Sequence, residues 1–243
     1  MSLVGQLVRA PYEISPEAVK RISWLRRRLL SWFARNGRSF PWRDPGRTPY
    51  EVVVAEILLQ RTTAAGVARA YAGFVERYPS WGTLAHAPLD GLENALRPLG
   101  LWRQKALAFQ QLAQSIEANG GVVPHTPKEL ECLRGIGPYT ASAVRAIVYR
   151  RAEALLDVNM ARLLGRFLGS AEHAEARPKR MLLALALRLV RSKRGLEVNW
   201  SALDFGALVC RARSPLCLEC PLRARCQYAR SLQLRATPSA NAL

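Results

Sequence analysis

The chain has 243 residues, 49% of them hydrophobic, which is enough apolar material for one or two packed cores and excludes an intrinsically disordered protein. The sequence lacks both the apolar run of about 18 residues that a membrane-spanning helix needs and a signal-peptide pattern, so we expect a soluble cytoplasmic protein. Lysine and arginine outnumber aspartate and glutamate by 36 to 18, and the net charge of +18 favours a polyanionic partner such as nucleic acid.

Helical periodicity dominates the chain. Residues 18–36 carry apolar side chains on one side, and Asn36-Gly37 ends that pattern. Further helices are predicted near 67–77, 89–97, 102–118, 126–133, 138–150, 160–168 and 178–192. Because alternating strand patterns are scarce, the sequence predicts an all-α protein. The tail 227–243 ends in small and polar residues and is predicted to be frayed.

One further helix carries a carboxylate among apolar residues. The stretch Thr48–Glu51 reads Thr-Pro-Tyr-Glu, a capping box with proline at the first helical position, and predicts the start of this helix. Glu56 lies four and three residues after Val52 and Val53 and three before Leu59, so its stripe is mostly apolar. A carboxyl group in such a place is either paired or functional, and burial should raise its pKa.

Two glycines mark a tight turn between two predicted helices. A second capping box at Thr126–Glu129 starts the first helix, and Leu-Arg-Gly-Ile-Gly at 133–137 interrupts it. Glycines in such a turn let the backbone approach a ligand closely. The amides of Gly135, Gly137 and Tyr139 would point outward at the start of the next helix, which favours anion binding. An ordinary corner between two helices is the alternative.

An acidic residue closes the next apolar run. Asp157 follows Ala-Leu-Leu at 154–156 and precedes a helical pattern, so it lies near a low-dielectric wall and a positive helix end. Either Asp157 or Asn159 can cap that helix. We predict that Asn159 caps it and that Asp157 faces a ligand-binding cleft.

Four cysteines stand within 17 residues near the C-terminus, at positions Cys210, Cys217, Cys220 and Cys226. Four thiolates at such short spacing can share one metal centre, and a reducing cytoplasm favours metal ligation over disulfides. Their spacing, C-x6-C-x2-C-x5-C, differs from the usual zinc pattern, although a structural zinc or two disulfides remain alternatives. Cys132 lies far from them and is predicted to be a small buried hydrophobe.

The cysteine spacing and the Gly-Ile-Gly turn upstream resemble the endonuclease III-like superfamily of helix–hairpin–helix DNA glycosylases, and the resemblance extends over roughly residues 22–228. It implies a [4Fe–4S] cluster on the four cysteines and a monomer that binds double-stranded DNA with a mismatched or damaged base. It also implies two helical lobes with a DNA-binding cleft between them. Residues 40–150 would form a six-helix barrel-like lobe with the hairpin, and 1–39 with 151–243 the cluster lobe.

The resemblance implies roles for three residues in base removal. Asp157 would stabilise positive charge on the sugar as the N-glycosidic bond breaks and help to orient water. Glu56 would protonate the base or hold a water, as a glutamate does in the adenine-removing branch. Tyr139 stands where other members carry the lysine that forms a Schiff base, which implies base removal without efficient strand cleavage. Lys105 is an alternative amine for such a lyase step.

The resemblance also implies DNA contacts and a substrate. The stretch Glu-Ile-Leu-Leu-Gln-Arg-Thr-Thr at 56–63 resembles archaeal-type mismatch glycosylases, in which Gln60 and Arg61 would contact DNA around the flipped nucleotide. Leu101 would wedge into the base stack, and Gly135 and Gly137 would hold a phosphate. The missing C-terminal domain of adenine glycosylases also favours thymine or uracil opposite guanine. An adenine glycosylase or a non-catalytic iron–sulfur DNA-binding module is the alternative.

Overall fold

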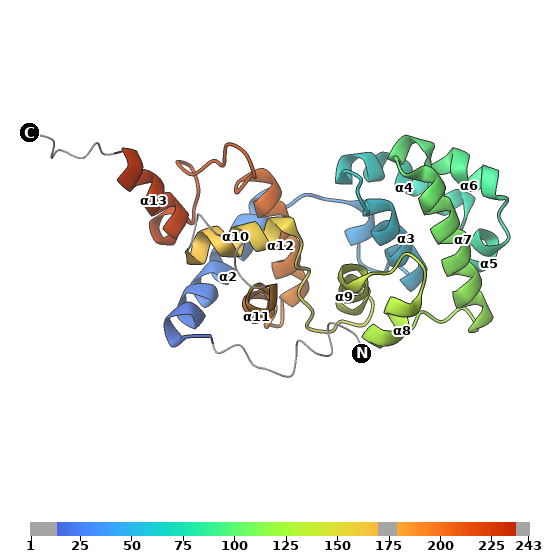
Figure 1. Cartoon of the computed structure of the whole chain (residues 1–243), viewed down its shortest axis with the longest axis horizontal. Helices are drawn as coiled ribbons and strands as arrows, with labels where there is room; N and C mark the ends of the chain where they lie inside the picture. Colours follow the sequence, from blue (N-terminus) through green and yellow to red (C-terminus); the bar gives the residue numbers. More distant parts are fainter. Residues whose placement is uncertain (1–13, 170–178, 237–243) are drawn as a thin grey trace, which may run out of the picture. The chain divides into compact units, whose positions relative to one another are not determined.

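The computed structural model describes residues 14–169 and 179–236, and these consist of helices joined by loops (Figure 1). The prediction of an all-α protein is confirmed, because no β-strand occurs in that part of the chain. Within the same residues, no helix is both long and apolar enough to span a membrane. The chain divides into two compact units: unit 1 contains Ser39–Arg151, and unit 2 contains the described residues before Ser39 and after Arg151.

Unit 1 is built around one buried helix. Its elements are η1 (Pro41–Arg43), α3 (Pro49–Leu59), α4 (Ala64–Arg77), α5 (Trp81–Ala85), α6 (Leu89–Leu96), η2 (Arg97–Leu99), α7 (Trp102–Ala118), α8 (Pro127–Cys132) and α9 (Pro138–Ile147). Helix α3 packs against α4, α7, α9 and η1, and α7 also packs against α5 and α6 (Figure 1). Because α3 is surrounded, any polar side chain on it is either buried or at an end.

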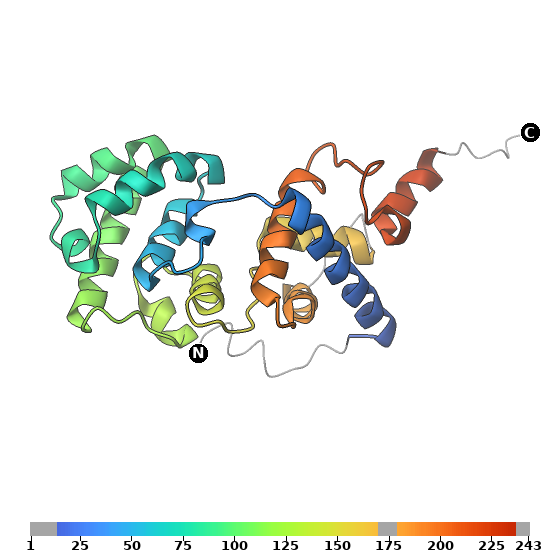
Figure 2. The same ribbon diagram turned by 180° about the vertical axis from the view of Figure 1, so that it is seen from behind.

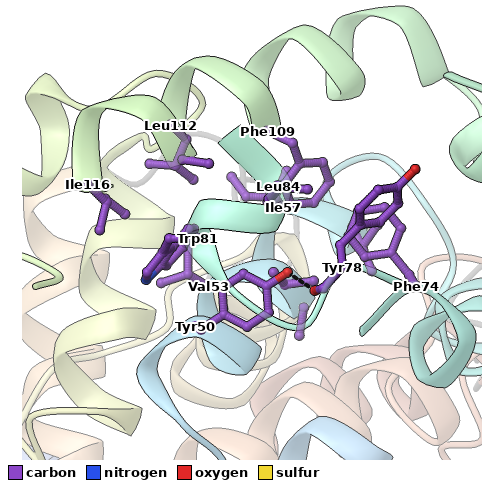
Figure 3. Close-up of a cluster of buried hydrophobic side chains, with 14 of the residues drawn as sticks. Tyr50, Val53, Ile57, Phe74, Tyr78, Trp81, Leu84, Phe109, Leu112 and Ile116 are labelled. Atoms are coloured by element: carbon purple, nitrogen blue, oxygen red, sulfur yellow. Dashed lines mark hydrogen bonds between the residues drawn. The ribbon is translucent and has the colours of Figure 1, made fainter. Parts of the chain in front are cut away.

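The core of unit 1 combines aliphatic residues of α3 and α7 with several aromatic side chains (Figure 3). Val53 and Ile57 of α3 are fully buried. Tyr50 packs edge-on against Trp81, with ring centroids 4.8 Å apart, and its hydroxyl donates to the backbone oxygen of Tyr78. The large aromatic side chains bury much apolar area and so fix α3 firmly in its place.

Unit 2 joins the N-terminal helix to the C-terminal part of the chain. Its elements are α2 (Pro16–Asn36), α10 (Val158–Leu168), α11 (Lys179–Val190), α12 (Gly195–Leu208), η3 (Arg223–Arg225) and α13 (Gln227–Ala236). Helix α2, dark blue in Figures 1 and 2, packs against α11 and α12. Its buried face consists of Ile22, Leu25 and Leu29. The apolar stripe predicted over 18–36 therefore faces the core.

Local sequence signals locate most of these helices. Both predicted capping boxes are present, at Thr48 and at Thr126. Helices α5 and α12 were not predicted. The tail is helical over Gln227–Ala236, so the prediction of a frayed segment is wrong there, and residues 237–243 lie outside the described part of the chain. Cys132 is exposed, so its prediction as a buried hydrophobe is also wrong.

Candidate active site

The predicted hairpin turn lies between α8 and α9 in unit 1. Gly135 has φ +81°, and a Cβ added there would lie 3.3 Å from the Cβ of Ala108 and 3.4 Å from the Cδ1 of Ile57. Both the conformation and the tight packing therefore require glycine at this position. Gly137 differs, because it caps α9 in an ordinary conformation with φ −94°, and a Cβ added there would meet no atom within 4 Å. The turn thus presents an open backbone surface at the N-terminus of α9, which is suited to an anion.

Gln60, directly after α3, braces this turn. Its Nε2 donates to the backbone oxygen of Gly135 at 2.8 Å and to the Oγ1 of Thr140 at 3.3 Å. In this structure the side chain is therefore directed at the hairpin, and its predicted contact with DNA stays a prediction.

Two exposed residues in turns of unit 1 have left-handed backbone conformations. Arg61 follows α3 with φ +55°, and Leu101 precedes α7 with φ +48° and 40% exposure. Side chains other than glycine seldom adopt this conformation, and it often marks functional turns. The hydroxyl of Thr62 donates to the backbone oxygen of Leu99 at 2.8 Å and joins the two turns. The structure thus brings together the predicted DNA contacts at positions 61 and 101.

Glu56 is buried within α3 and is 8% exposed. Burial raises the pKa of this carboxyl group from 4.5 to about 7, and the opposing attraction of Arg43 offsets only part of that shift. At neutral pH a substantial fraction of Glu56 therefore carries a proton that it can donate. This is the property that a general acid requires.

Unit 1 contains two further candidate residues, the phenol of Tyr139 and the amine of Lys105, and they differ in how exposed they are. Tyr139 is the second residue of α9 and is 38% exposed, close to the open backbone of Gly137. Lys105 is only 4% exposed, and its Nζ donates to the backbone oxygen of Leu58 at 2.8 Å and to the Oγ1 of Thr62 at 2.5 Å. Because that amine is buried and already bonded, the structure gives no support to Lys105 as an attacking group.

In unit 2, Asp157 caps helix α10. Its carboxylate accepts hydrogen bonds from the backbone nitrogens of Asn159 and Met160, at 2.9 and 2.8 Å. The prediction that Asn159 is the cap is therefore wrong, because the helix begins two residues earlier than its apolar pattern and Asn159 lies inside the first turn. Burial raises the pKa of Asp157, whereas the hydrogen bonds from Met160 and Asn159 favour the charged form.

Asp157 is the first member of a chain of polar contacts within unit 2. The Nδ2 of Asn159 donates to the Oδ2 of Asp157 at 2.6 Å. Arg162 donates from Nη2 to the Oδ1 of Asn159 at 2.7 Å and from Nε to the backbone oxygen of Cys210 at 2.8 Å. Gly206 permits the close approach, because a Cβ there would lie 2.7 Å from the Cβ of Asn159. The acid is thus connected to the first of the four clustered cysteines.

Sequence reasoning missed a second support for Asp157. Asn199 on α12 is buried, accepts from the backbone nitrogen of Leu155 at 2.8 Å and donates to the backbone oxygen of Glu153 at 2.9 Å. These bonds fix the segment that leads into Asp157. Only the helical spacing of Asn159 and Arg162 is visible as a signal in the sequence, since Asn199 lies more than forty residues downstream.

The four clustered cysteines line one cavity in unit 2, which is also lined by Arg166 and Tyr228. All four are free thiols, so two disulfides are not formed. Burial raises the pKa of Cys217, Cys220 and Cys226, that of Cys220 to about 11.

These four cysteines are the residues of unit 2 that could hold a metal cofactor. Among the described residues, no three His, Cys, Asp or Glu side chains are grouped closely enough to hold a single metal ion. Four soft sulfur donors that line one cavity have the chemistry that an iron–sulfur cluster requires of its ligands. The Nη1 of Arg166 lies 3.7 Å from the Sγ of Cys210 and would provide positive charge beside the thiolates.

Comparison with known proteins identifies the group to which this architecture belongs. Residues 54–187 match the family described as "HhH-GPD superfamily base excision DNA repair protein". The chain is 40% identical to a thymine-DNA glycosylase of Aeropyrum pernix, over 86% of this chain and 95% of that protein. It is 31% identical to the human adenine DNA glycosylase over 91% of this chain, but it spans only 44% of that protein's length.

Solved structures agree with these sequence matches. A thermostable thymine-DNA glycosylase shares 30% identity with a TM-score of 0.81, over 87% of this chain and 98% of that one. An endonuclease III in a non-covalent complex with DNA shares the fold, with a TM-score of 0.77 and 22% identity, over 91% of this chain and all of that one. The predicted resemblance is confirmed, and the chain belongs to the HhH-GPD superfamily of base excision DNA repair proteins.

Proposed function

We propose that this protein is a monofunctional DNA glycosylase that flips and removes thymine or uracil mispaired with guanine. The observation that carries the proposal is the 40% identity to a thymine-DNA glycosylase over nearly the whole of both chains. Tyr139 supports the monofunctional assignment, because a phenol cannot form the Schiff base with which a lysine starts strand cleavage.

In the proposed reaction the two acids have different tasks. Glu56, buried and partly protonated at neutral pH, supplies a proton or holds a water at the departing base. Asp157 stabilises the positive charge that develops on the sugar as the N-glycosidic bond breaks, and helps to orient the attacking water. Its three hydrogen bonds hold it in one orientation, so little reorganisation is required when that charge appears.

The experiment that tests the substrate is a panel of duplexes containing T:G, U:G, A:G and A:8-oxoguanine, treated with alkali after reaction. Excision at T:G and U:G supports the proposal, and excision confined to A:8-oxoguanine and A:G would establish an adenine glycosylase instead. Borohydride should trap no covalent adduct. Binding without excision on every duplex would leave only a DNA-binding module.

The hairpin turn would grip a DNA phosphate through backbone amides. Substituting Gly137→Ala should leave the free energy of unfolding almost unchanged, because the position is open and its φ is ordinary. The added methyl group would, however, hold a phosphate away from the turn. We expect affinity for any duplex to fall by roughly tenfold, the size of one lost charge-assisted contact. Fluorescence anisotropy would measure it. Gly73→Ala, also without a neighbour within 4 Å, is the matched control.

The four cysteines would bind a [4Fe–4S] cluster, which when present cross-links the segment 210–226 and orders it. The proposed ligands are Cys210, Cys217, Cys220 and Cys226. Protein purified without oxygen should contain about four irons and four sulfides per chain and absorb visible light. Cys220→Ser, which removes a largely buried donor, should abolish that absorbance, whereas Cys132→Ser should retain it. One tightly bound zinc per chain would contradict the cluster assignment.

A further inference from the structure

Lys105 is an unusual core residue. Only 4% of it is exposed, and the two acceptors of its ammonium group are the neutral oxygens of Leu58 and Thr62. Burial lowers the pKa of Lys105 to about 8. An amine with neutral partners in a core lowers stability compared with an apolar side chain, so its presence calls for another explanation.

Thr62 connects Lys105 to a second turn through hydrogen bonds. Its hydroxyl accepts from the Nζ of Lys105 at 2.5 Å and donates its one proton to the backbone oxygen of Leu99 at 2.8 Å, which is closer than the alternative acceptor, the backbone oxygen of Gln60 at 3.3 Å. A hydroxyl has one donor and two acceptor positions, so both bonds form at the same time. The three residues form an ordered series from α7 through the α3–α4 turn to η2, called here the Lys105–Thr62–Leu99 relay.

The relay joins the two turns with strained backbone. Arg61 precedes Thr62 with φ +55°, and Leu101 follows Leu99 by two residues with φ +48°. Such conformations are unfavourable for residues other than glycine and persist only where surrounding contacts impose them. The relay supplies that constraint to both turns from one buried point, while the side chains at 61 and 101 remain exposed.

We infer that Lys105 and Thr62 are positioning residues that lock the two turns together, so that Arg61 and Leu101 meet the DNA as one rigid body when a nucleotide leaves the stack. This inference rests on the proposed function. Neither positioning residue needs to touch DNA, because each acts through the backbone of the turns. A rigid pair of inserting groups requires less ordering on binding than two independent loops.

The test compares Thr62→Val with Thr62→Ser. Valine has the shape of threonine but cannot form either bond of the relay, whereas serine retains the hydroxyl. A duplex whose mispaired thymidine carries a 2′-fluorine, which slows cleavage, and whose neighbour is 2-aminopurine reports unstacking by fluorescence. We expect Thr62→Val to lower the flipping equilibrium about tenfold, as for one buried hydrogen-bond series, and Thr62→Ser to remain near wild type. Affinity for a matched duplex, which reports only the phosphate contacts, should not change.

A double-mutant cycle with Lys105→Met tests the relay itself. If the two residues act through one series, Lys105→Met adds little to Thr62→Val, and strictly additive effects on flipping would overturn the relay. Normal flipping in Thr62→Val, or equal losses in the valine and serine variants, would overturn the inference while the proposed function stands. A wild-type protein that neither flips nor excises a mispaired base would refute the proposed function and the inference together.

Discussion

Asp157→Asn is expected to bind mismatched DNA normally and to lose base excision by roughly 10²–10³-fold, the usual effect of removing one electrostatic group from an active site. Asparagine has nearly the shape of aspartate and is an equally good helix cap. Its amide oxygen can still accept from the backbone nitrogens of Asn159 and Met160. The substitution therefore removes the negative charge and keeps the backbone cap of α10, although the bond from the Nδ2 of Asn159 is lost because the new amide nitrogen would face it. Single-turnover excision on a T:G duplex, with enzyme in excess, measures the loss.

Two further variants separate charge from structure at this position. Asp157→Ala should lower the free energy of unfolding by about 1 kcal/mol through the lost cap, which Asp157→Asn should not do. Asp90→Asn makes the same chemical change on an exposed acid of α6 and should leave excision unchanged. Near-normal single-turnover rates for Asp157→Asn would show that the carboxylate is a structural cap alone.

Glu56→Gln should slow excision by roughly 10²–10⁴-fold, the contribution usual for a general acid or base. The wild-type rate should decrease as pH rises through about 7, because the folded carboxyl group then loses the proton that it would donate. Glutamine does not titrate, so the remaining activity of the variant should show no such decrease. Excision measured between pH 5.5 and 8.5 tests both statements, and an unchanged pH profile in the variant would exclude Glu56 as the titrating group.

The same substitution should stabilise the protein at alkaline pH. The pKa of Glu56 is about 7 in the folded protein and has its ordinary value of 4.5 in the unfolded chain. The folded state therefore binds the proton more tightly. The free energy of unfolding therefore decreases from pH 4.5 to 7, and above pH 7 the full penalty of the buried charge is about 3 kcal/mol. Glu56→Gln avoids this penalty at pH 8 and gains nothing at pH 4. Urea unfolding at the two pH values provides the measurement, and a loss of stability at pH 8 would contradict the assigned pKa.

Local chemistry explains why much of the fold could be predicted. Helix boundaries at Thr48 and Thr126 follow from capping boxes whose partners lie three residues away. The spacing of apolar residues likewise gave the bounds of α7. The residues that produce these signals lie close together in the sequence, so both partners of each interaction can be read from the sequence alone.

The parts that could not be predicted depend on distant partners. Helix α12 carries three buried polar residues, Asn199, Ser201 and Asp204, which interrupt its apolar pattern. Asp204 is satisfied by Arg38, whose Nη2 lies 2.6 Å from its Oδ1, and nothing near either residue in the sequence indicates this pair. The role of Lys105 in the relay could not be predicted for the same reason, because its partners Leu58 and Thr62 lie more than forty residues away in the sequence.

The start of α10 shows a third kind of failure. Its first residue, Val158, is 76% exposed, although an apolar residue there would be expected to face the core. The apolar pattern therefore begins at Met160 and predicts Asn159 at the capping position that Asp157 occupies. Two residues that both cap well, separated by one position, cannot be ranked by their intrinsic preferences.

The order of synthesis has a consequence for how unit 2 forms. Helix α2 leaves the ribosome early, but the helices against which it packs, α11 and α12, come from the far end of the chain. Roughly 140 residues separate the end of α2 from the start of α11, so the apolar face of Ile22, Leu25 and Leu29 stays uncovered for on the order of ten seconds of translation. The helices of unit 1 lie in this intervening part of the chain, so unit 1 can fold during that time. In the nascent chain this apolar face is therefore accessible to a chaperone until α11 and α12 have been synthesised.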